Sequence, residues 1–246
     1  MQMPFYIKRS DGEPLPDEPV SYTISRDGLY MNRSTPLFKS SVPCRNPRDF
    51  ARHEATLEWN RPIPRHVAEQ AVGFFHAVNC RSPGAEAILL LGWSPENGYE
   101  AIVPEQRAVV ALHAFGRRSP LRVSYEVPAM RAGVVVAGSI HSHACIEAFS
   151  SDTDDWDTRN RAGLHITVGR IDLPVEPPDL YAIVIVDRFT FIIENPLALF
   201  AGYTRRSTDI PENWLARVKV EEVLLRRPAG KPGARESRRQ PVNHEN

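Results

Sequence analysis

Short apolar segments of five to eight residues, separated by proline, glycine or polar residues, constrain the fold of this chain more than any other feature. The chain has 246 residues and 22 prolines, which cluster at the two ends and in short connectors. Because proline interrupts helices, this distribution limits the helix content. Segments of this length and composition are typical of strands. The predicted strands cover residues 86–93, 99–103, 108–113, 121–125, 134–141, 164–169, 181–186 and 189–193.

Two segments on either side of these strands have helical periodicity. The first begins near Pro64, which suits a first helical turn, and its apolar residues recur at spacings of three and four: Val67, Ala71, Phe74, Phe75 and Val78. The second is predicted over 211–227, after an N-cap at Asp209, with Trp214, Leu215, Val218 and Leu225 on or near one face. The predicted fold class is therefore α+β, a layered domain in which helices flank a mixed β-sheet.

The sequence divides into three predicted parts. Residues 1–60 are predicted to form a small β-rich N-terminal extension, in which 1–20 is a proline-rich arm and Asp27-Gly28 is the turn of a hairpin. Residues 61–227 are predicted to be the main domain. The tail, 228–246, is polar and rich in proline, glycine and arginine, and is predicted to be disordered.

Composition excludes several classes of function. Thirty basic and thirty acidic residues cancel, so nucleic acid is not the expected partner. No apolar run reaches the roughly 20 residues that cross a bilayer, and the first residues lack the apolar stretch of a signal peptide. Three cysteines without a CxxC motif cannot build a disulfide framework. We therefore expect a cytoplasmic protein that does not bind membranes.

Residues 141–154, HSHACIEAFSSDTD, have the spacing of a metal site. His141 and His143 lie two apart at the end of a predicted strand, so both imidazoles point to one face and make half of a tetrahedral zinc site. A catalytic zinc ion needs a third protein ligand, for which Asp154 is the candidate and Asp152 and Asp155 are rivals. Ser151 precedes Asp154 by three residues, which places both on one side of a turn or short helix.

This pattern, His-x-His-x7-Ser-x2-Asp, resembles the signature of the JAMM metalloproteases, also called the MPN+, JAB or Mov34/PAD-1 family, and the match extends over residues 64–195. The resemblance implies an MPN-like fold and a catalytic glutamate at the start of the first core strand, where this chain has Glu86. Glu100, Glu105 and Glu126 are rivals for that role. A charged residue that opens the run Ala-Ile-Leu-Leu-Leu is unusual for a buried strand and favours Glu86.

Within the prokaryotic branch, AIVPEQ at 101–106 and HSHACIEAFSSDTDDWD at 141–157 resemble members encoded in PRTRC cassettes, which also encode a ThiF/E1-related protein. The chain departs from many members at Ala144, where they carry proline. The resemblance implies one Zn2+ per chain, bound by His141, His143 and Asp154.

The implied reaction is hydrolysis of an amide or isopeptide bond. The metal would lower the pKa of a bound water toward about 7, Glu86 would act as general base, and Ser151 would stabilise the oxyanion. The resemblance implies a ubiquitin-like protein or its conjugate as substrate and an E1/ThiF-like protein as a further partner. A non-catalytic scaffold and a zinc hydrolase of a small amide are the alternatives. His165 is interpreted as a packed strand residue or a partner of the ligands, and Cys145 as a small buried residue.

Overall fold

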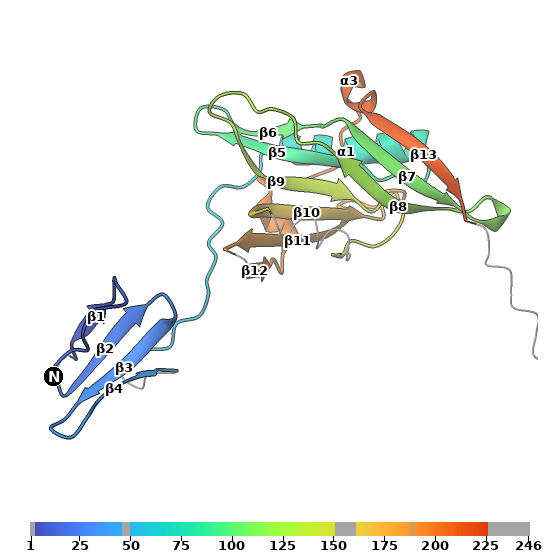
Figure 1. Cartoon of the computed structure of the whole chain (residues 1–246). Coiled ribbons are helices and arrows are strands. Elements are labelled where there is room, and N and C mark those ends of the chain that lie inside the picture. The colour runs from blue at the N-terminus through green and yellow to red at the C-terminus, as the bar shows by residue number, and fades with distance from the viewer. Residues whose placement is uncertain (1–2, 46–49, 151–160, 188, 226–246) are drawn as a thin grey trace, which may run out of the picture. The chain divides into compact units, whose positions relative to one another are not determined.

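The structure is a computed structural model that describes residues 3–45, 50–150, 161–187 and 189–225 (Figure 1). The chain consists of two compact units, Met1–Thr56 and Leu57–Asn246. No helix in the described ranges has the length and apolarity needed to span a membrane. The predicted tail, 228–246, lies outside these ranges.

The first unit is a four-stranded sheet in the order β1-β2-β3-β4, formed by Phe5–Ile7, Val20–Ser25, Gly28–Ser34 and Lys39–Pro43. The predicted hairpin is confirmed, but its turn is Arg26-Asp27, one residue before the predicted Asp27-Gly28, because Ser25 pairs with Gly28. The prediction of an arm over 1–20 is wrong at β1, which pairs in parallel with β2. The fully buried ring of Tyr22 packs between Phe5 and Phe50, with centroid distances of 6.2 and 5.0 Å.

The second unit contains a six-stranded mixed sheet in the order β12-β11-β10-β9-β5-β6. β9 and β10 pair in parallel, and the other neighbours pair antiparallel. All six strands were predicted from apolar segments, and the structure confirms each within a few residues. Their bounds are Ile88–Ser94 (β5), Gly98–Ile102 (β6), Val135–Ser142 (β9), Gly163–Gly169 (β10), Asp179–Val186 (β11) and Phe189–Ile192 (β12).

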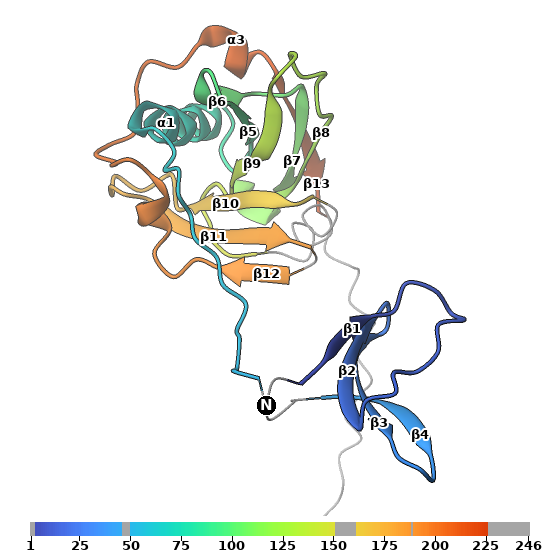
Figure 2. The same ribbon diagram turned by 90° about the vertical axis from the view of Figure 1, so that its left-hand side faces the viewer.

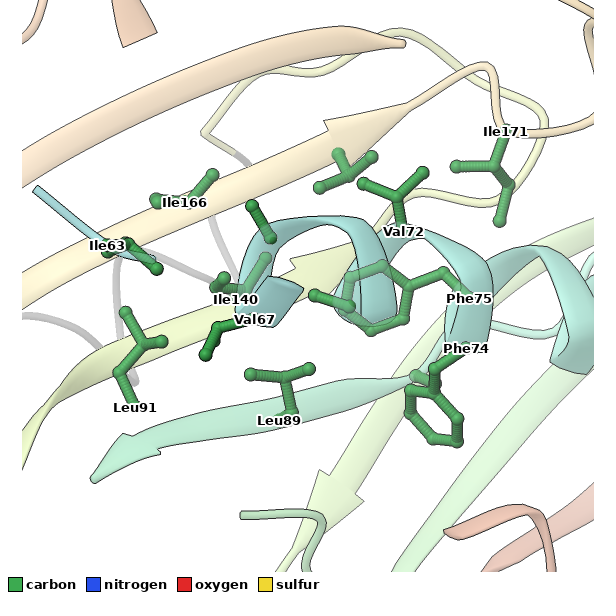
Figure 3. Close-up of a cluster of buried hydrophobic side chains, with 14 of the residues drawn as sticks. Ile63, Val67, Val72, Phe74, Phe75, Leu89, Leu91, Ile140, Ile166 and Ile171 are labelled. Carbon is green, nitrogen blue, oxygen red and sulfur yellow. The ribbon is translucent and has the colours of Figure 1, made fainter. Parts of the chain in front are cut away.

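Helix α1, Arg65–Arg81, covers one face of this sheet and confirms the helix predicted after Pro64. Its apolar stripe, which includes the fully buried Phe74 and Phe75, packs against side chains from β5, β9 and β10 (Figure 3). Burial of each such ring contributes up to about 3 kcal/mol. The strand residues that meet the helix are alternate ones, among them Leu89, Leu91, Ile140 and Ile166.

A second sheet, of three strands in the order β13-β7-β8, completes the unit (Figure 2). Its strands are Val218–Leu224, Gln106–Leu112 and Arg118–Tyr125. The remaining described elements are short: the 3-10 turns Ala114–Gly116 and Pro196–Leu199, and α3, Glu212–Leu215. Trp214 of α3 packs edge-on against Phe74, with ring centroids 5.7 Å apart.

The predicted α+β class with helices flanking the sheet is wrong, because the structure is mostly β, with 40% strand and 13% helix. The error lies mainly in the helix predicted over 211–227, which ends at Leu215 and gives way to β13. The β-branched Val218 and Val220 alternate with charged residues and favour a strand. The edge of β7 on the side away from β8 supplies a parallel partner for that strand. Cross-strand ion pairs, Arg107–Glu221 at 3.2 Å and Arg118–Glu222 at 2.9 Å, accompany the pairing.

Candidate functional site

The two histidines of the motif lie side by side inside the second unit. His141 is the last but one residue of β9, and His143 follows the strand end. Their side chains are almost completely buried, with 7% and 3% of each residue exposed, and their ring centroids are 5.2 Å apart. The structure thus confirms that His-x-His places both imidazoles on one face.

That face is the one opposite α1. Ile140, between Ser139 and His141, packs into the core beneath the helix, so its two neighbours on β9 point to the other side (Figure 3). His141 lies opposite Ile88 of β5 and Thr167 of β10. The histidines are therefore at the end of β9, flanked by strands on both sides.

The ring of His143 is held in one tautomer. Its Nδ1 lies 3.0 Å from the carbonyl oxygen of Glu147. Because a carbonyl oxygen only accepts hydrogen bonds, Nδ1 carries the proton, and the lone pair of the neutral ring is on Nε2. The ring of Phe149 packs edge-on against this imidazole at a centroid distance of 4.7 Å. A metal-binding histidine usually donates the N–H of its other ring nitrogen to a backbone carbonyl or a carboxylate, which fixes the orientation of the ring.

Glu86 lies at the matching end of β5, two residues before Ile88. The Ser142 N–H donates to the Ala87 carbonyl oxygen at 2.9 Å, so Ala87 pairs with the residue between the two histidines. Ala85 and Ala87, on either side of Glu86, both pack into the core beneath α1. Glu86 lies before the first residue of β5, so strand alternation does not fix the direction of its side chain. Glu86 is half-buried. The pairing of Ala87 with Ser142 thus brings the backbone of Glu86 close to the end of β9.

The rival carboxylates have other surroundings. Glu100 forms an ion pair with Arg131 at 2.7 Å. Glu105 and Glu126 are exposed. Ser151, Asp154 and the rival ligands Asp152 and Asp155 lie outside the described residues. Within the described ranges no group of three or more histidine, cysteine, aspartate or glutamate side chains is arranged to hold a metal ion.

His165 is a packed strand residue, as interpreted from the sequence. Its Nε2 lies 3.0 Å from the Arg161 carbonyl oxygen and therefore donates, while its Nδ1 accepts from the Ser139 hydroxyl at 2.9 Å. Burial lowers the pKa of His165 below its usual value. Both nitrogens of a neutral ring are thus engaged, which makes His165 unsuited to be a ligand.

The prediction that Cys145 is buried is wrong, because its side chain is exposed. The chain leaves the strand at Ala144, whose φ is 49°. Ala144 is fully buried, and its carbonyl oxygen accepts from the Ile171 N–H at 3.0 Å. Proline fixes φ near −65°, so the backbone after His143 differs from what a proline at position 144 would allow.

Two residues at the site were not found by sequence reasoning. Ser142, fully buried, accepts through its hydroxyl from the Ala87 N–H at 3.0 Å. Gln106, 4% exposed, uses its side-chain amide to bond the backbone of Ile88. The signal for Ser142 is its place between the histidines. The signal for Gln106 is the proline two residues before it, which ends β6.

The donors in the described part of the site suit zinc. Two buried imidazoles on one face are half of a tetrahedral set, and His143 has the supporting backbone contact that orients a ligand. For His141, the Nε2 atom lies 3.4 Å from the Thr167 hydroxyl.

Comparison with known proteins finds no matching family model and no matching curated protein. Among solved structures, the chain is similar to a Desulfitobacterium hafniense protein determined in solution, with 14% identity, coverage of 67% of this chain and 95% of that chain, and a TM-score of 0.37. It is also similar to a JAB1/MPN domain protein from Archaeoglobus fulgidus, with 18% identity, coverage of 55% and 94%, and a TM-score of 0.32. Both TM-scores are below 0.5, so neither likeness bears on function.

Proposed function

We propose that this chain is a zinc-dependent peptidase or isopeptidase of the JAMM type, which hydrolyses an amide or isopeptide bond at the C-terminus of a ubiquitin-like modifier. One observation carries the proposal: the end of β9 presents two buried imidazoles on one face, and Ala87, the neighbour of Glu86, pairs with the residue between them. The His-x-His-x7-Ser-x2-Asp spacing supplies the other half of the argument.

His141, His143 and Asp154 would hold one zinc ion per chain. The ion would supply Lewis-acid activation of water and of the scissile carbonyl. The Glu147 carbonyl would keep the Nε2 lone pair of His143 aimed at the ligand position, because it holds the Nδ1 proton. Both rings are buried, and metal binding requires imidazoles in the neutral form.

Glu86 would be the general base. It would accept a proton from the attacking water as the new C–O bond forms, and it would return that proton to the nitrogen as the C–N bond breaks. The products are a carboxylate and an amine. Ser151 would donate a hydrogen bond to the oxyanion of the tetrahedral intermediate. The half-buried position of Glu86 at a strand end suits this role better than those of the exposed Glu105 and Glu126.

The substrate class rests on the resemblance of the motif. A ubiquitin-like protein or its conjugate would supply the acyl part, and an E1/ThiF-like protein would be the further partner. Formation of a ubiquitin-like conjugate by such a protein would provide the bond that this chain cleaves.

The proposal is tested by metal analysis and hydrolysis. Protein purified without added metal should contain or take up one zinc ion per chain, and His141→Ala should lose it. Ubiquitin with a C-terminal aminomethylcoumarin amide serves as the hydrolysis probe, and a linear fusion of a ThiS-like protein to a short peptide serves as the second. Glu86→Gln should retain zinc and lose about 100-fold or more in rate.

The matched control is Glu105→Gln, which makes the same chemical change at an exposed site. It should leave zinc content and rate unchanged. Absence of stoichiometric zinc, or failure of the zinc-loaded protein to cleave either probe, would contradict the proposed function. A fully active Glu86→Gln would assign the base to another carboxylate.

A further inference from the structure

At its first residue, Ile88, close to Glu86 in the chain, strand β5 is not paired with β6. β5 and β6 pair antiparallel with Leu90 opposite Ile102. Two residues farther, the same register brings Ile88 opposite Pro104. Proline has no backbone N–H and cannot donate to the ladder. β6 ends at Ile102, two residues before this proline.

Gln106 takes over the role of the missing strand. The Ile88 N–H donates to Gln106 Oε1 at 2.8 Å, and Gln106 Nε2 donates to the Ile88 carbonyl oxygen at 2.9 Å. The same Nε2 donates to the Pro104 carbonyl oxygen at 3.3 Å. A side-chain amide has the donor and acceptor geometry of a peptide group, so one residue satisfies both backbone groups of Ile88 in the buried interior.

On the β9 side of β5, Ser142 forms hydrogen bonds with both backbone groups of Ala87. The hydroxyl of Ser142 accepts from the Ala87 N–H, and the Ser142 N–H donates to the Ala87 carbonyl oxygen. The two residues that follow Glu86 are thus bonded in opposite directions, Ala87 toward β9 and Ile88 toward Gln106. Both anchors are almost completely buried.

We infer that Gln106 is a positioning residue that fixes Glu86 relative to His141 and His143. This inference rests on the proposed function, in which Glu86 is the base. Gln106 acts through the backbone of Ile88, which lies directly opposite His141. Loss of its amide releases the end of β5 from one side and lets Glu86 move away from the attacking water. The two histidines are on β9 or directly after it, and they keep their own backbone contacts with β10.

The test uses Gln106→Met, which keeps the length of the side chain and removes its hydrogen bonds. The control is Gln70→Met, the same change at a half-buried site on α1, against the other face of the sheet. In the metal-free full-length chain, amide hydrogen exchange at Ile88 should accelerate about tenfold in Gln106→Met and not in Gln70→Met. Exchange in β10 and β11 should stay as in the wild type.

In the zinc-loaded chain, Gln106→Met should lower kcat on the coumarin probe about 10- to 100-fold, with zinc stoichiometry and KM unchanged. In the Glu86→Gln background the same substitution should have no further effect on the residual rate, because the group it positions is already gone. A loss limited to folding would not produce this non-additivity, since it would lower the rate by the same factor in both backgrounds.

Unchanged exchange at Ile88, an unchanged kcat in Gln106→Met, or an equal loss in both backgrounds would overturn the inference while the proposed function stands. A wild-type chain that neither holds zinc nor cleaves the probes would overturn the proposed function, and this inference with it.

Discussion

Gly169, the last residue of β10, should control how firmly His143 is held. A Cβ atom at this position would lie 2.3 Å from the Ala148 backbone nitrogen and 2.5 Å from the Glu147 carbonyl carbon. These atoms are backbone and cannot rotate aside, so the segment that follows the histidines must move if residue 169 gains a side chain. Glycine here allows the close approach of two backbones.

The size of the effect follows from the distances. An ordinary carbon–nitrogen contact needs about 3.4 Å, so the segment must shift by about 1 Å. The hydrogen bond from His143 Nδ1 to the Glu147 carbonyl oxygen is 3.0 Å long and would be lost or badly weakened by such a shift. Loss of a contact that orients a metal-binding histidine costs about 10- to 100-fold in metal affinity. The clash itself costs about 1–3 kcal/mol of folding free energy.

We therefore expect Gly169→Ala to lower zinc affinity at least about tenfold, measured by competition with a chromophoric chelator. Gly73→Ala, on helix α1, is the matched control. Its Cβ atom would lie 2.1 Å from the Ser207 carbonyl oxygen, so it makes a comparable clash away from the histidines. Both variants should have a lower melting temperature, but only Gly169→Ala should bind zinc more weakly. Zinc affinity within about twofold of the wild type, well below the expected loss, or an equal loss in Gly73→Ala, would refute this reasoning.

Two further predictions concern the backbone after His143 and a half-buried carboxylate. Ala144→Pro should destabilise the chain by about 3 kcal/mol or more in chemical denaturation, because φ at this position is 49° and proline requires about −65°; a variant as stable as the wild type would contradict the observed turn. Burial raises the pKa of Glu176, but hydrogen bonds from Tyr203 and Arg206 outweigh burial and lower the pKa below its usual 4.5. A depressed carboxylate pKa stabilises the fold above the usual value, and this stability is lost as pH falls through the folded-state pKa. Glu176→Gln should therefore reduce the loss of unfolding free energy as pH falls below about 4.5, and an unchanged pH dependence would argue against this contact.

The part of the fold that sequence reasoning predicted is the part with a strong apolar period. α1 was predictable because Val67, Ala71 and Phe74 repeat at helical spacing and all three are buried. The strands of the six-stranded sheet were predictable because each is a short apolar run. The failure at 211–227 has a different cause: Trp214, Leu215 and Val218 fit one helical face by coincidence, while the partner edge of β7 is not visible in the local sequence.

The site, like the fold, was predicted correctly where the strand pattern is regular and wrongly where it ends. Strand alternation correctly put His141 and His143 together. The same rule failed for Cys145, because backbone pairing with β10 extends only to His143, whose N–H donates to the Val168 carbonyl oxygen, and Ala144 then turns the chain through a left-handed conformation. A motif gives the spacing of side chains, and alternation is valid only as far as the strand extends.

The residues that hold the site in place are harder to read from a sequence than those that would perform chemistry. Gln106 has no ionisable group, and its role appears only when the register of β5 and β6 places Pro104 opposite Ile88. Gly169 matters because it has no Cβ atom, which would clash with a backbone segment more than twenty residues earlier in the chain. Both roles arise from pairing between distant segments, so they follow from the three-dimensional register and not from local composition. Gln106→Met is expected to change the rate without changing zinc affinity, and Gly169→Ala to lower zinc affinity. If both results are observed, the start of β5 and the end of β9 are supported independently.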